Sequence, residues 1–220
     1  MIAIVVAVVL VAGTGAFLLF RGGGGKPGPD KSGGLSTVSP GSSTPEFHFR
    51  LRSTKVVATG HSGSSGGVKD VVNEVRDRLS TMYALAFLDP SRWQKGDYET
   101  VYGFFSLGKT AAAAKRDTEV LTLGANAGDT FESVEPKYGG LVVRVLTDKN
   151  GNPFTTVATA DFTASGKQKN GKTMVIKSHA TYYLQSGEGG WIIVGYKAKR
   201  SDHTGEGSPA PEASGSGGSG

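Results

Sequence analysis

The sequence predicts an α+β fold: an N-terminal transmembrane helix, then about three helices packed on one face of a curved antiparallel sheet of four to six strands. Three observations predict this class. Residues 2–20 carry no charge, apolar residues between 68 and 118 recur at helical spacing, and residues 140–199 alternate between apolar and polar positions with turn residues between the runs. The apolar stripes of the helices need a partner, and the predicted sheet is the only surface large enough.

Composition narrows the function classes. The chain has 220 residues, and its 34 glycines are unevenly spread, with 14 of them in residues 22–41 and 205–220, so one folded domain of ordinary size is expected between these ranges. The absence of cysteine excludes disulfides, thiol catalysis and cysteine-ligated zinc. A net charge of +5, without a run of like charges, favours solubility and an acidic surface as partner.

The N-terminal stretch from Ile2 to Phe20 predicts a membrane anchor over residues 1–21. Nineteen residues in a helix span about 28 Å, close to the hydrocarbon thickness of a bilayer. A cleaved signal peptide is the alternative, but a basic n-region and an Ala-x-Ala cleavage site are both missing.

Two features point to opposite orientations of this anchor. Arg21, Lys26 and Lys31 follow the span, and the positive-inside rule would keep that side in the cytoplasm. Residues 22–45 are a Gly/Ser/Pro tether with an expected reach of roughly 27 Å, which suits a domain held out through a cell wall. We expect a single-pass protein of the cell membrane with an extracytoplasmic C-terminal domain.

The folded domain is expected over residues 46–200, with a disordered tail at 201–220. Phe47 to Arg52 alternates as a half-buried edge strand with basic residues outward. A first helix should run from Val68 to about Phe87, where Asp89-Pro90 ends it. A second should begin at Asp97 and end at Gly108, and a third should cover Lys109 to about Thr118.

Tight turns divide the rest into antiparallel strands. Turns are expected at residues 148–151, 169–171 and 187–190, because Asn-Gly and Gly-rich pairs between alternating runs are strong hairpin signals. Phe131 to Val134 is predicted as a further strand. Phe154, Ala158 and Phe162 should share the face toward the helices, and Tyr182 should lie on the same side.

This order of elements resembles a known family. A leading helix, two short helices and long strands closing on Gly189-Gly190-Trp191-Ile192-Ile193-Val194-Gly195-Tyr196 resemble the nuclear transport factor 2-like (cystatin-like) cone. The anchor, tether and lone domain look like actinobacterial membrane-tethered members, including proteins of mammalian-cell-entry operons and conjugation channels. The resemblance covers residues 66–200, and the added strand at 46–57 departs from it. The superfamily holds both enzymes and non-enzymatic domains, so the fold alone does not decide activity.

The sequence contains few residues in patterns typical of a catalytic, metal-binding or phosphate-binding site. An isomerase-like pocket would need a carboxylate and a tyrosine on one side, yet strand parity separates Asp161 from Tyr182, with Tyr83 and Tyr102 as other interior candidates. The histidines lack metal-ligand spacing: His48, His61, His179 and His203. The serines Ser62, Ser64 and Ser65 lack the strand-to-helix context of a nucleophile elbow, and Gly22 to Lys26 is no phosphate-binding loop. Trp93 is either a core residue, which is favoured, or an exposed anchor for a partner.

We therefore expect no catalytic residue, no cofactor and no metal site. The predicted function is a membrane-anchored, non-catalytic extracytoplasmic binding or assembly domain of a cell-envelope complex for transport or secretion. The alternative is a small-molecule pocket enzyme, of isomerase or dehydratase type, on the same fold. Expected partners are membrane lipid around the N-terminal helix and an envelope protein or apolar ligand. Nucleic acid is not expected, because the basic residues are spread along the chain.

Overall fold

The computed structural model describes residues 46–58, 67–187 and 190–205, all within one compact unit, residues 41–220. The predicted anchor (1–21) and tether (22–45) lie outside the described residues, as does the predicted tail from residue 206 onward. No helix in the described ranges is long and apolar enough to cross a bilayer.

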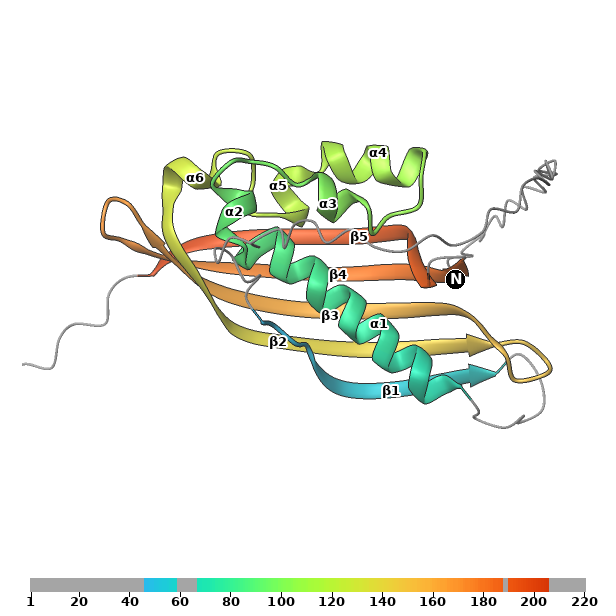
Figure 1. Cartoon of the computed structure of the whole chain (residues 1–220). Helices are drawn as coiled ribbons and strands as arrows, with labels where there is room; N and C mark the ends of the chain where they lie inside the picture. The colour runs from blue at the N-terminus through green and yellow to red at the C-terminus, as the bar shows by residue number, and fades with distance from the viewer. Residues whose placement is uncertain (1–45, 59–66, 188–189, 206–220) are drawn as a thin grey trace, which may run out of the picture. The chain divides into compact units, whose positions relative to one another are not determined.

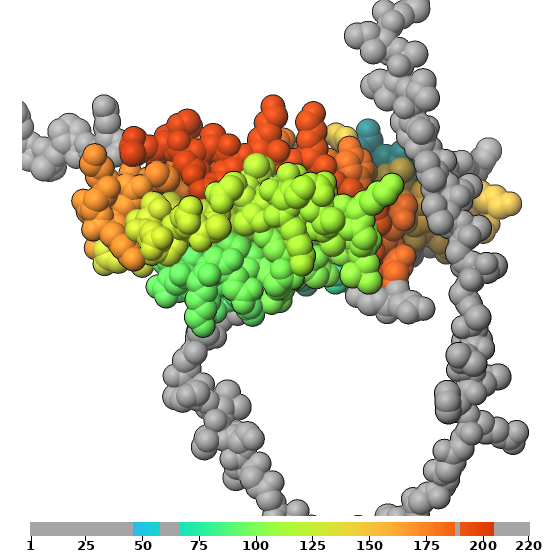
Figure 2. Space-filling view, turned by 90° about the horizontal axis from the view of Figure 1, so that it is seen from above, coloured from blue at the N-terminus to red at the C-terminus, as the bar shows by residue number. Residues whose placement is uncertain are grey.

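The described residues form two layers, a sheet and a set of helices on one of its faces (Figure 1). The five strands lie in the order of the chain: β1 (Arg50–Ala58), β2 (Phe131–Thr147), β3 (Pro153–Gln168), β4 (Thr173–Gly187) and β5 (Gly190–Gly205). The helical layer contains α1 (Val68–Tyr83), the π-helical turn η1 (Ala84–Leu88), α2 (Pro90–Trp93), α3 (Glu99–Tyr102), α4 (Lys109–Arg116), α5 (Thr118–Leu121) and α6 (Ala127–Thr130). Figure 2 shows the green helices stacked on the orange and red strands.

The predicted fold class is wrong in its sheet. The sheet is mixed, because β1 pairs with β2 in parallel, whereas β2 to β5 are antiparallel. The helical layer follows β1 and carries the chain back before β2 begins, and such a crossover connection makes neighbouring strands parallel. The prediction of an edge strand at residues 47–52 is right about its edge position, but strand pairing begins only at Arg50.

The predicted set of three helices is also wrong. The first continues from α1 into η1 and ends at Leu88 before Asp89-Pro90, as expected. The second shrinks to the single turn α3, whose N-cap is Tyr98 and not the predicted Asp97, although the Asp97 carboxylate accepts a hydrogen bond from the Glu99 N–H at 3.2 Å. The third breaks at Asp117 into α4 and α5, and two more single turns, α2 and α6, were not expected.

The hairpin turns predicted at residues 148–151 and 169–171 are confirmed, and at the third Gly187 pairs with Gly190, while residues 188–189 between them lie outside the described residues. At the first turn, the Gly151 N–H donates to the Asp148 carbonyl at 3.0 Å, and at the second the Gly171 N–H donates to the Gln168 carbonyl at 2.9 Å. Gly151, Gly171 and Gly190 all have positive φ, which glycine adopts without strain. The predicted strand at Phe131 is the start of β2, and β5 continues to Gly205, past the predicted domain end at residue 200.

An aromatic cluster joins the layers. Phe162 of β3 contacts Phe47, Tyr83 and Phe87, with ring centroids 5.0 to 5.4 Å apart. The hydroxyl of Tyr83 accepts from Tyr182 at 3.1 Å and bonds Ser178 at 3.3 Å, so the buried phenols are satisfied. This core fills the space between α1 and the sheet.

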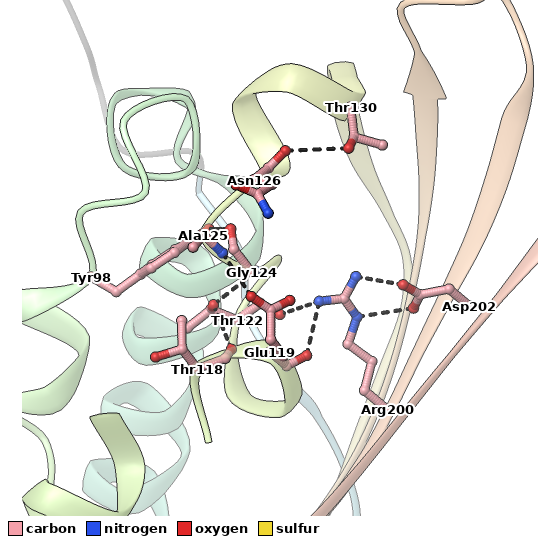
Figure 3. Close-up of polar contacts among 10 residues, drawn as sticks. All are labelled: Tyr98, Thr118, Glu119, Thr122, Gly124, Ala125, Asn126, Thr130, Arg200 and Asp202. Atoms are coloured by element: carbon pink, nitrogen blue, oxygen red, sulfur yellow. Dashed lines mark hydrogen bonds and ion pairs between the residues drawn. The ribbon is translucent and has the colours of Figure 1, made fainter. Parts of the chain in front are cut away.

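A second contact fixes the short helices to β5 (Figure 3). The Arg200 guanidinium donates to the carbonyls of Glu119, at 3.1 Å, and of Thr122, at the C-terminal end of α5, while Asp202 accepts from its other nitrogens. A cation at this end also complements the helix dipole. Nearby, the buried Tyr98 hydroxyl donates to the Gly124 carbonyl at 3.1 Å.

Phe162→Ala should lower the free energy of unfolding by about 3–5 kcal/mol, because it empties the centre of the aromatic cluster. Phe154→Ala is the matched control: it lies on the same strand and the same face but is 45% exposed, against 1% for Phe162. Urea denaturation should show a loss below about 1 kcal/mol for that control. Equal losses in the two variants would contradict the described core.

Burial raises the pKa of Tyr98 from 10.0 to about 12. Between these values the unfolded chain has lost a proton that the folded chain keeps, so stability should fall as pH rises from 10 to 12. Tyr98→Phe should cost about 0.5–1.5 kcal/mol at pH 8 through the lost hydrogen bond. Its urea midpoint should then decline less steeply than that of the wild type above pH 10, and parallel declines would refute the assignment.

Candidate functional site

The uncovered face of the sheet carries a row of polar residues across three strands. Among the described residues, no helix packs on this face, which we call the open face (Figure 1). Asp161 of β3 lies opposite His179 of β4, and His179 lies opposite Lys199 of β5. Facing residues in a sheet point to the same side, so the three side chains lie together on the open face.

The Asp161 carboxylate is bound from two sides. Its Oδ1 lies 2.5 Å from His179 Nδ1, and its Oδ2 accepts from Arg52 Nη1 at 3.4 Å. A carboxylate only accepts, so His179 Nδ1 carries the proton and leaves Nε2 without a partner among the described residues. The Asp161 side chain is 38% exposed, so these are surface contacts of modest energy.

Gly140 makes the contact with Arg52 possible. Arg52 belongs to β1, where it lies in the bulge, and Gly140 of β2 is paired with Arg50 on one side and with Asp161 of β3 on the other. A Cβ on Gly140 would collide with the Tyr138 hydroxyl and with the Arg52 side chain. The missing side chain therefore lets Arg52 and Tyr138 lie across β2, beside Asp161.

A hollow of about 530 Å³ adjoins this row. The open-face residues that line it are Tyr138, Asp161, Thr163, Lys177, His179, Lys199 and Ser201. Its volume lies within the range of small-molecule sites. Its lining includes hydroxyl, ammonium and imidazole groups and one carboxylate, although most of its surface is apolar.

The open face as a whole is basic. By register it carries Lys55, Arg144, Lys177, Lys197 and Lys199. In the part of the chain that the structure describes, none of these five cations has a carboxylate within ion-pair distance. Such a surface attracts anions.

The structure does not bring together the residues of an isomerase-like pocket. Asp161 lies on the open face, whereas Tyr83 and Tyr182 are buried on the other side of the sheet. Tyr102 lies in α3, where its hydroxyl bonds Thr118. The parity argument that separated Asp161 from Tyr182 is confirmed.

The other sequence candidates do not join the site. The Nε2 atom of His48 lies 3.4 Å from the Oε1 atom of Glu46. Trp93 is buried in the core, which was the favoured alternative. His61 and the three serines Ser62, Ser64 and Ser65 lie outside the described residues, as does the Gly22 to Lys26 stretch. Within the described ranges no group of three His, Asp or Glu side chains could hold a metal ion, and His203 is an exposed residue near the end of β5.

Sequence reasoning missed the pairing of Asp161 with His179, although a signal for it existed. The turn pairs Gln168 with Lys172 by a 2.8 Å hydrogen bond, and β3 and β4 show no register shift. Counting outward from this turn places Asp161 opposite His179. The reach of Arg52 could not be found this way, because it depends on the bulge between Leu51 and Ser53.

Comparison with known proteins does not assign the chain to a family. No family model matches the chain, and neither the curated proteins nor the solved structures give a match.

Proposed function

We propose that this chain is a membrane-tethered, non-catalytic binding or assembly domain of a cell-envelope complex, and that the open face is its binding surface. The observation that carries the proposal is the contrast between the two sides of the sheet. The centre of the helix side is filled by aromatic rings, and only a smaller hollow of about 390 Å³ remains there, between α1 and β1. The open face is basic, has a larger hollow and is uncovered among the described residues.

The filled interior argues against a ligand inside the fold. Tyr83, Phe87 and Phe162 occupy the space between α1 and the sheet, with ring centroids 5.0 to 5.3 Å apart. The buried phenols bond one another rather than facing an empty volume. A partner is therefore bound more readily on the surface than in the core.

The tethering rests on the sequence. The uncharged stretch from Ile2 to Phe20 and the Gly/Ser/Pro-rich residues 22–45 support an anchor followed by a spacer. The resemblance to actinobacterial membrane-tethered members of the nuclear transport factor 2-like superfamily stays a prediction. It supports an extracytoplasmic location and a role in transport or secretion.

One observation favours the alternative, a small-molecule enzyme. The Asp161–His179 pair could act as a base, and Ser201 lies diagonally across from His179 on β5. Against this, the pair is open to solvent, and no hydrogen bond joins Ser201 to His179 in the described chain. The N–H groups of the central strands are committed to the ladder and cannot stabilise an oxyanion. Turnover of a small molecule that Asp161→Asn abolishes would reverse this preference.

A photo-crosslinking residue on the open face should capture the partner in the cell that makes the protein. Tyr183 is the best position, because it is 45% exposed on the open face and p-benzoylphenylalanine preserves its aromatic ring. Irradiation should give one discrete adduct of higher mass.

Leu107 is the matched control position, being 92% exposed and located between α3 and α4. The same photoreactive residue there should give no such adduct. Adducts of equal yield at both positions, or none at Tyr183, would contradict a binding role for the open face.

Reporter fusions test the location. Alkaline phosphatase fused after residue 40 or at the C-terminus should be active, because that enzyme matures only outside the cytoplasm, and β-galactosidase at the same positions should be inactive. The opposite result would place the domain in the cytoplasm, in accordance with Arg21, Lys26 and Lys31.

A further inference from the structure

We propose that the hollow around Lys177 and Lys199 is a binding site for a phosphate group carried by a small polar molecule or a lipid headgroup. The inference rests on the proposed function, because it specifies what the open face binds. Four features of the described residues support it.

The first feature is two neighbouring lysines without counter-charges. Lys199 faces His179 and Lys177 faces Ser201, so Lys177 and Lys199 are diagonal neighbours on adjacent strands. Diagonal neighbours are about 7–8 Å apart, with their Cβ atoms somewhat closer, and the flexible ammonium groups of both can reach one point between them. Lys197 follows on the same face of β5. Clustered like charges on a sheet are unfavourable alone and are stabilised by an anion between them.

The second feature is that the only carboxylate in the hollow lining is already occupied. Asp161 is bound by Arg52 and His179, so its negative charge is offset within the protein. It therefore opposes an incoming anion less than a free carboxylate would. His179 Nε2 is left as an additional polar group at the rim.

The third feature is a set of free hydroxyl donors. Thr163, Ser201 and Tyr138 line the hollow, and none of their hydroxyls has a hydrogen-bond partner among the described residues. A phosphate group has more acceptor oxygens than a carboxylate and can use ammonium and hydroxyl donors together. Lysine binds phosphate as a point charge, whereas planar carboxylates favour the arginine fork.

The fourth feature is the size of the hollow. A volume of about 530 Å³ exceeds the need of a bare phosphate and accommodates a glycerol- or sugar-sized group attached to it. Because the hollow is open to solvent, the rest of a larger molecule can extend away from the sheet. Both a soluble phosphate ester and a phospholipid headgroup share this chemistry.

Calorimetric titration of the full chain in non-ionic detergent tests the site. At low salt, sn-glycerol 3-phosphate or dihexanoyl phosphatidylglycerol should bind with one site per chain, whereas glycerol should not bind. Tighter binding of the lipid than of the free ester would identify a headgroup site, and the reverse would identify a soluble ester. 1,2-Dihexanoylglycerol, which has the same acyl chains and no phosphate, controls for partition into the micelle and should not bind the site.

Lys177→Gln and Lys199→Gln should each weaken binding at least about tenfold, because each removes a charge-assisted hydrogen bond. Lys149→Gln is the charge-matched control in the β2–β3 turn, away from the hollow, and should leave affinity unchanged. All three side chains are on the surface, so thermal unfolding should be nearly unaltered.

The inference would be overturned by equal losses in all three variants, by no binding of either phosphate compound, or by sulfate binding as tightly as glycerol phosphate. If phosphate fails while the Tyr183 crosslink still forms, only this inference is lost. If both fail, the binding role of the open face is lost as well.

Discussion

The alternation of side chains along the strands governs both the stability and the site of this domain. On β3, every second residue from Thr156 to Ala164 is buried against the helices, and the residues between them face the open side. A shift of the strand register by one residue would move every side chain of β3 to the opposite face, so the residues of one face cannot be repositioned without those of the other. Phe162 and its neighbours Asp161 and Thr163 illustrate this: the packing of one ring sets the position of two groups of the hollow.

Gly139 and Gly140 are adjacent in β2, and each leaves room for side chains on a different face of the sheet. A Cβ on Gly139 would lie 2.6 Å from the Phe47 ring, so its absence admits the segment before β1 to the aromatic core. The missing Cβ of Gly140 admits Arg52 and Tyr138 on the open face. These two glycines thus allow Phe47 to pack in the aromatic core and Arg52 to reach Asp161 on the open face.

The sequence was sufficient where local chemistry decides the structure. The hairpin turns specify which strands pair, and the turn at residues 169–171 specifies the register of β3 on β4 without interruption. It was insufficient where contacts between residues distant in the sequence determine the structure. The alternation of Phe47, Phe49 and Leu51 marks a half-buried strand but contains no information on its direction, which follows from the crossover through the helical layer.

The same division explains the helices and the site. Asp117 interrupts the predicted third helix, and Arg200, which is remote in sequence, binds the carbonyls exposed at the end of α5. The side of the sheet on which Asp161 lies follows from strand parity, and its partner His179 follows from the turn. Its contact with Arg52 requires a bulge in β1 and a glycine in β2, and no local pattern predicts that combination.

A rigid sheet is a suitable support for a charged surface. Neighbouring lysines on one face repel one another, and the domain must offset that cost elsewhere. The aromatic contacts of Phe162 and the capping of α5 by Arg200 lie directly beneath the open face and supply stability that does not depend on the lysines. The backbone of Lys177 is fixed by ladders on both sides of β4, and that of Lys199, on the edge strand β5, is fixed by its ladder with β4, so a ligand need order only the side chains. Preorganisation of this kind lowers the entropic cost of binding, and it accounts for a binding surface on paired strands rather than on a loop.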